Sequence, residues 1–175
     1  MRDTPRVDVA AHYRHLVALG REAFLAAAAP AAFVRYPSPV IARLAAGDRS
    51  VLLEGETLDV PVSATSGAVQ IDLEVFQLVK KPGASFPDRI TIGRTPNNDI
   101  AVSDPSVSRF HAYVRQASDG WVVADAGSRN GSWLRGVRLE PRREQPLPSM
   151  VVLRLGEIDL TFYVANDLYA ALGGS

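Results

Sequence analysis

Short apolar runs separated by turn-forming residues constrain the fold of this chain more than any other feature. From Val69 onward these runs recur about every ten residues, a spacing typical of an all-β sandwich. Pro146 and Pro148 argue against a central strand near them, so residues 140–149 are predicted to form a loop. The predicted strands cover residues 69–80, 89–93, 100–102, 110–116, 121–125, 132–134, 151–155 and 158–164.

The N-terminal third has a different pattern. Residues 8–29 carry an apolar stripe at helical spacing, with Asp8 as a candidate N-cap and Pro30 as the stop. A proline-punctuated, irregular stretch follows. Further on we expect a short helix at 39–46, one or two strands within 51–62, a small polar linker at 63–67, and a C-terminal helix at 166–172 that ends at Gly173.

These patterns divide the chain into three parts. Residues 1–66 form an N-terminal extension, helical and then irregular, whose function the sequence does not assign. Residues 67–165 form the β-sandwich, and residues 166–175 a short helix and tail. Because the stripe around Tyr13 and Phe24 would leave a large apolar patch exposed, we expect residues 1–62 to pack on the β-domain or in a homodimer contact.

Composition restricts the classes of partner. The 175 residues include 47% apolar residues, enough for a sandwich core, and 19 basic residues balance 19 acidic ones. This neutrality argues against binding to a nucleic-acid backbone. The longest apolar run, residues 23–34, contains Pro30 and is too short to span a bilayer. We therefore predict a cytoplasmic protein that binds neither nucleic acid nor membrane.

Three turn segments contain the side chains best suited to bind an anion. Gly93-Arg94 ends one predicted strand, Ser108-Arg109-Phe110-His111 opens another, and Gly127-Ser128-Arg129-Asn130-Gly131 follows a third. Residues 94–143 hold eight arginines and five acidic residues, a local positive excess in a neutral chain. A guanidinium can donate two parallel hydrogen bonds to a phosphate. The sequence therefore predicts a small anion site where these loops meet.

The order G-R, S-x-x-H, N-G over residues 70–164 resembles the forkhead-associated (FHA) domain, a phosphothreonine-peptide binding module. The resemblance implies a mainly β fold: a twisted antiparallel β-sandwich, here with a helical N-terminal extension and a short C-terminal helix. It assigns phosphate binding to Arg94, Ser108 and Arg109. It assigns peptide contacts to Arg129, Asn130 and Ser128, with Asn98 at the rim, and structural support to Gly93, His111 and Gly131.

One position departs from the family pattern. Arg129 stands directly before Asn130, where the family more often has a small hydroxyl residue. The arginine adds a positive contact to phosphate or to an acidic ligand residue, or it crowds the pocket and changes selectivity.

Catalysis is the main competing interpretation. Ser108 and His111 supply a nucleophile and a base, but no third, orienting carboxylate is evident from the spacing. The chain has three histidines and no cysteine, and no P-loop pattern. We therefore expect no enzyme activity, cofactor or metal. The predicted partner is a phosphothreonine-containing protein in Ser/Thr-kinase signalling or assembly; the alternatives are a phosphate-independent interaction scaffold and, less favoured, a hydrolase.

Overall fold

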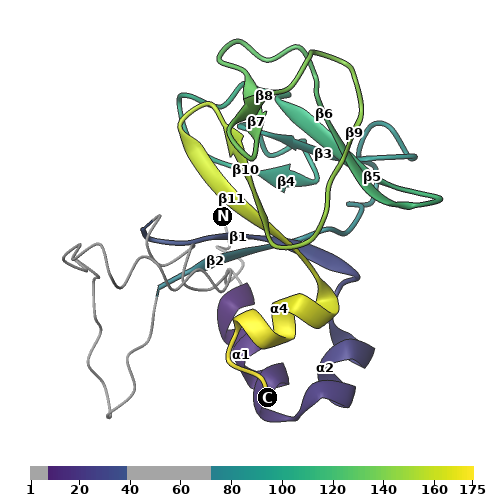
Figure 1. Cartoon of the computed structure of the whole chain (residues 1–175), viewed down its shortest axis with the longest axis vertical. Helices are drawn as coiled ribbons and strands as arrows, with labels where there is room; N and C mark the ends of the chain where they lie inside the picture. Colours follow the sequence, from purple (N-terminus) through teal and green to yellow (C-terminus); the bar gives the residue numbers. More distant parts are fainter. Residues whose placement is uncertain (1–7, 39–71) are drawn as a thin grey trace, which may run out of the picture.

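The computed structural model describes residues 8–38 and 72–175, which form a β-sandwich with helices gathered at one end (Figure 1). One sheet has the strand order β2-β1-β11-β10-β7-β8, and the other the order β4-β3-β5-β6-β9. The strands of the first sheet are β2 (Glu74–Gln77), β1 (Ala31–Arg35), β11 (Ile158–Val164), β10 (Val151–Leu155), β7 (Ser132–Leu134) and β8 (Val137–Arg138). Those of the second are β4 (Ile100–Ala101), β3 (Ile90–Gly93), β5 (Ala112–Ala117), β6 (Gly120–Asp125) and β9 (Gln145–Pro146).

The main core lies between the two sheets. β10 alternates, so that Val151, Leu153 and Leu155 are buried in a cluster with side chains of the facing sheet. Phe162 of β11 packs against Phe33 of β1, with ring centroids 5.5 Å apart. Period-two burial of this kind is what joins two sheets into one sandwich. The predicted fold class is confirmed.

Most predicted strands are confirmed, with some differences. From residue 89 onward the predicted strands agree with the observed ones within two residues at each end, and β2 lies inside the predicted strand 69–80. β8 and β9 were not predicted. β9 falls in the predicted loop 140–149, and it can contain Pro146 because it is an edge strand. The pair β3–β4 is parallel, so the sheets are not wholly antiparallel.

Strand β1 corrects the prediction for the N-terminal third. The region after Pro30 was predicted to be irregular, but Ala31–Arg35 pairs antiparallel with both β2 and β11. Its first four residues are all buried, so the strand has no polar alternation that sequence patterning could detect. The predicted domain boundary at 66/67 lies outside the described residues. Because β1 lies within the six-stranded sheet, the N-terminal part of the chain contributes directly to the sandwich.

The helices also differ from expectation in one respect. The single helix predicted for residues 8–29 is two helices, α1 (Val9–Ala18) and α2 (Arg21–Ala27). Gly20 separates them at φ 95°, a conformation that glycine adopts readily. The N-cap is confirmed, since Asp8 Oδ1 accepts a hydrogen bond of 3.1 Å from the main-chain N of Ala11. The predicted C-terminal helix is α4 (Ala165–Ala171).

A second core joins these helices to the sheet, and we call it the helical cluster. Its centre is Phe24, whose ring meets Tyr13 of α1 and Tyr169 of α4 edge-on, at 5.6 and 5.3 Å between centroids. The other members are Ala10, Leu16, Ala32, Val34, Val75, Tyr163 and Leu168. The predicted packing of the N-terminal region on the β-domain is confirmed for residues 8–38; the elements predicted between 39 and 67 lie outside the described residues. No helix in the described ranges is long and apolar enough to cross a membrane.

Candidate functional site

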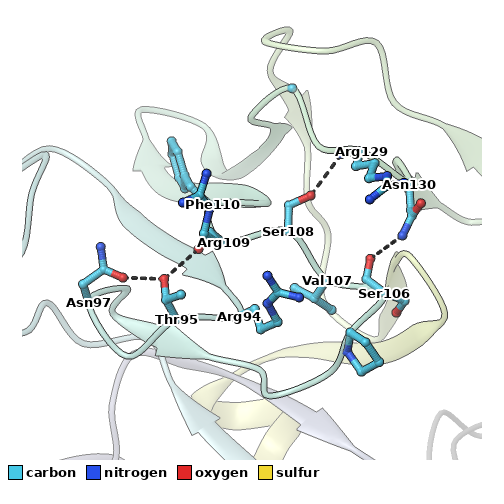
Figure 2. A pocket seen from close by; sticks show the side chains of 12 residues that line it. Arg94, Thr95, Asn97, Ser106, Val107, Ser108, Arg109, Phe110, Arg129 and Asn130 are labelled. Atoms are coloured by element: carbon cyan, nitrogen blue, oxygen red, sulfur yellow. Dashed lines mark hydrogen bonds between the residues drawn. The ribbon is translucent and has the colours of Figure 1, made fainter.

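Three loops meet around a pocket of about 830 Å³ (Figure 2). The first follows β3, the second precedes β5 and the third follows β6. The pocket is lined by Arg94, Thr95, Asn97, Pro105, Ser106, Val107, Ser108, Arg109, Phe110, Gly127, Arg129 and Asn130. The structure thus brings together the three turn segments that the sequence singled out, and it adds Thr95, Asn97 and the 105–107 turn, which were not among the candidate site residues.

Arg94 is held at its main chain while its side chain stays available. Its N–H donates to the carbonyl of Ser108 at 2.9 Å, which fixes the first loop to the second. The side chain is exposed and forms no ion pair within the described part of the chain. In Figure 2 the guanidinium points toward Ser108. A side chain at Gly93 would collide with the carbonyl of Arg109, so only glycine allows the two loops to approach this closely.

Ser108 links the second loop to the third. Its Oγ accepts a hydrogen bond from the main-chain N of Arg129 at 3.0 Å (Figure 2). The hydroxyl hydrogen has no acceptor among the described residues. A serine hydroxyl can donate and accept at the same time. Ser108 therefore still has a donor for a ligand placed in the pocket.

His111 lies beneath the pocket and is completely buried. Its Nδ1 accepts from the main-chain N of Ser108 at 2.9 Å, so the proton is on Nε2, which donates to the carbonyl of Gly131 at 2.9 Å. Burial lowers the pKa of His111, and the Gly131 carbonyl and the Asp125 charge oppose this more weakly. A neutral ring thus joins the Ser108 loop to the Gly131 turn, a geometry suited to the support role predicted for it.

This geometry differs from that of a hydrolytic pair. His111 contacts the main-chain N–H of Ser108, whereas the Ser108 hydroxyl faces Arg129. A general base must reach the proton of the nucleophile it activates. Among the described residues there is also no group of three or more metal-ligating side chains.

Asn98 and Ser128 are not at the pocket, which corrects two predicted peptide contacts. Asn98 is 4% exposed, and its Nδ2 donates to the carbonyls of Thr95 at 2.9 Å and Arg109 at 2.6 Å. Ser128 Oγ donates to Asp125 at 2.6 Å and accepts from the N–H of Gly131 at 2.9 Å. Asn98 Nδ2 and Ser128 Oγ thus bond to other groups of the protein, so we assign both side chains to loop support.

Asp125 is a residue that sequence reasoning missed. Its buried carboxylate accepts hydrogen bonds from the main-chain N–H of Gly127 and Ser128, and from the hydroxyls of Ser128 and Ser132. Burial alone would raise the pKa of this carboxyl, but the bonds from these residues outweigh it and lower the pKa. An aspartate two residues before a glycine at a strand end is a turn signal that could have identified it.

Arg109, Arg129 and Asn130 form the exposed rim. In Figure 2 Arg109 lies on one side of Ser108, and Arg129 and Asn130 lie on the other. Asn130 Nδ2 donates to the carbonyl of Ser106 at 2.8 Å, which positions the amide and leaves its Oδ1 free to accept within the described residues. Neither arginine side chain forms an ion pair there.

Comparison with known proteins identifies the family. The sequence profile of the FHA domain matches residues 90–156, a stretch that includes all three loops. An oxoglutarate dehydrogenase inhibitor of Corynebacterium glutamicum is 30% identical over 133 residues, 72% of this chain and 91% of that protein. The chain belongs to the FHA family.

Two further proteins are similar to this chain. The oxoglutarate dehydrogenase inhibitor of Corynebacterium efficiens is 39% identical over 106 residues, 57% of this chain and 72% of that protein. A solved structure of Mycobacterium tuberculosis EmbR in complex with a low-affinity phosphopeptide is 27% identical, with a TM-score of 0.41. That match covers 44% of this chain and 20% of the EmbR chain.

Proposed function

We propose that this FHA protein binds a phosphothreonine-containing segment of a partner protein, with the phosphate between Arg94, Ser108 and Arg109. One observation carries the proposal: the exposed guanidinium of Arg94 and the free hydroxyl hydrogen of Ser108 line one pocket. A phosphate of about −1.5 to −2 charge needs permanent donors of this kind. Recognition by arginine on braced loops is a recurrent mode of phosphopeptide binding.

The rim residues define the rest of the interaction. Arg109 adds a second positive charge beside Ser108, and Asn130 Oδ1 accepts from the main chain of the bound peptide. The bond from Asn130 Nδ2 to Ser106 supports this role, because it fixes the amide before the ligand arrives. A preference for threonine over serine follows from family membership. The module acts in Ser/Thr-kinase signalling or assembly and not as a catalyst.

The first test compares phosphorylated and unphosphorylated forms of one peptide. The tightest binder from a degenerate phosphothreonine library is titrated by calorimetry, followed by its threonine and phosphoserine versions. We expect binding only when the peptide is phosphorylated, and tighter binding with phosphothreonine than with phosphoserine. Equal binding of the phosphorylated and unphosphorylated peptides would support the phosphate-independent scaffold instead.

Substitution of Arg94 tests the site itself. Arg94→Ala should lower phosphopeptide affinity by about 2 to 5 kcal/mol, because it removes a charge-assisted contact to phosphate. Arg143→Ala is the matched control, since Arg143 is exposed and paired with Glu140 away from the pocket. Unchanged affinity in R94A, with the fold confirmed by circular dichroism, would place the phosphate elsewhere.

A second candidate function comes from the relatives. The Corynebacterium proteins that match this chain over most of their length are named oxoglutarate dehydrogenase inhibitors. This similarity supports 2-oxoglutarate dehydrogenase as one candidate partner. The test is the activity of that enzyme with increasing amounts of the purified chain; no change at saturating protein would exclude inhibition.

A further inference from the structure

Two exposed phenylalanines form an aromatic surface beside the phosphate pocket. Phe86 is 48% exposed and Phe110 37% exposed, and their rings stack with centroids 5.7 Å apart and 18° between planes. They are the only aromatic side chains among the exposed large hydrophobic residues of the described ranges. Phe110 also lines the phosphate pocket. The aromatic surface is therefore continuous with the proposed binding site.

This surface is held in place by neighbouring residues. The Arg89 guanidinium lies 5.6 Å from the centroid of the Phe86 ring and 4.5 Å from that of Tyr113. Asp88 fixes the same guanidinium, with Arg89 Nη2 2.6 Å from its Oδ2. The main-chain N of Arg89 donates to the carbonyl of Phe86 at 3.2 Å. These contacts orient the Phe86 ring toward Phe110 in the unbound protein.

The backbone at Phe86 adds a second observation. Its φ is 60°, in the left-handed region that bulky side chains rarely adopt. Such a conformation persists only when surrounding contacts enforce it, and it occurs often at ligand-binding sites. Here the enforced conformation leaves a phenylalanine half exposed to solvent. Neither packing in the core nor the conformational needs of a turn explain why a phenylalanine stands at position 86.

We propose that Phe86 and Phe110 bind an apolar side chain of the phosphothreonine ligand, and so determine specificity on the Arg109 side of the pocket. This inference rests on the proposed function. Figure 2 shows Phe110 next to Arg109, with Ser108 between them and the Arg129–Asn130 rim. An extended peptide advances about 3.3 Å per residue, and we place the apolar side chain about two to four residues from the phosphothreonine. Covering the rings removes apolar surface from water.

The geometry favours a phosphothreonine peptide, rather than a second copy of the chain, as the ligand that covers the two rings. The exposed rings adjoin a polar, arginine-rimmed pocket, and a second copy would have to place acidic groups there in place of the phosphate. A peptide with a phosphate and a nearby leucine, isoleucine or phenylalanine complements both surfaces at once. Binding energy from the apolar contact then adds to that from the phosphate.

The experiment uses a degenerate phosphothreonine peptide library and the full-length chain. For the wild-type protein we expect enrichment of apolar residues at one or more positions two to four residues from the phosphothreonine, on one side of it. Phe110→Ala and Phe86→Asn should abolish this enrichment while retaining selection of phosphothreonine. Asparagine is chosen at position 86 because it tolerates positive φ. Leu25→Ala, at an exposed apolar position on α2, is the control and should retain the enrichment.

Measured affinities of the variants for two matched peptides make the test quantitative. Against the peptide with the enriched residue, F110A and F86N should each bind about five- to tenfold more weakly; against the same peptide with alanine there, they should match the wild type. Equal loss on both peptides, or a wild-type profile with no apolar enrichment, overturns the inference and leaves the proposed function standing. A concentration-dependent dimer that F110A abolishes would also overturn the inference. Absence of any phosphothreonine selection overturns the proposed function itself.

Discussion

The helical cluster and the phosphate pocket are stabilised in different ways. Phe24, Tyr13 and Tyr169 pack as buried rings at the centre of an apolar cluster. The pocket is shaped by buried polar groups, with Asp125, His111 and Asn98 each bonded to more than one loop group. Apolar packing tolerates small shifts, whereas a hydrogen-bond network fixes atoms within a few tenths of an ångström. The helical cluster therefore contributes to stability alone, whereas the polar network around the pocket sets the ligand geometry and contributes to stability as well.

Phe24→Ala should give the largest effect, and it should fall on stability alone. Removing a completely buried ring from the helical cluster should lower the free energy of unfolding by about 3 to 5 kcal/mol. Chemical denaturation measures this, with Leu25→Ala as the neighbouring exposed control. Phosphopeptide affinity, titrated where the variant is folded, should be unchanged. A parallel loss of affinity would show that the two regions are coupled.

Asp125→Asn should lower both the stability of the protein and its affinity for the phosphopeptide. It removes the charge that four donors share in the Gly127–Ser132 turn, so the free energy of unfolding should fall by about 2 to 4 kcal/mol. Affinity should fall too, because Arg129 and Asn130 lose their anchored turn. Denaturation and calorimetry on one preparation test this. Stability loss with full affinity would contradict the role given to Asp125.

The difference between the two regions also explains what the sequence could predict. Arg94, Ser108 and Asn130 were identified because they lie in turns with a recognisable order. Asn98 and Ser128 were misassigned because an asparagine or serine in a loop can face a ligand or the main chain, and the residue type does not decide which. Strand β1 was missed because both its faces are buried, and Gly20 splits a helix that periodicity alone would continue.

His111 should make stability depend on pH. Its pKa is lowered in the fold, so between the folded value and the ordinary value of about 6.5 the unfolded chain holds more protons. The free energy of unfolding should therefore fall as pH decreases below about 6.5, by at most about 1.4 kcal/mol per pH unit. Denaturant titrations from pH 7.5 to 5 test this against His111→Gln. If the free energy of unfolding depends equally on pH in the wild type and in His111→Gln, the lowered pKa assigned to His111 is wrong.

Arg129→Thr should give the smallest effect. Its main-chain N–H donates to Ser108 whatever the side chain, so the loop geometry should persist. Only an exposed charge at the rim is lost, and affinity should fall by about 1 kcal/mol or less, with a weaker dependence on salt. Titrations at low and high salt measure this. A gain in affinity would mean that the arginine crowds the pocket.

Amide chemical-shift mapping by NMR with the selected phosphothreonine peptide tests the central claim most directly. We predict that the largest shifts fall in residues 94–97, 105–110 and 127–131, and that amides of α1, α2 and α4 barely move. The same titration with the unphosphorylated peptide should leave the spectrum unchanged. Largest shifts in the helices, or equal shifts without phosphate, would contradict the assignment of phosphopeptide binding to the loop pocket.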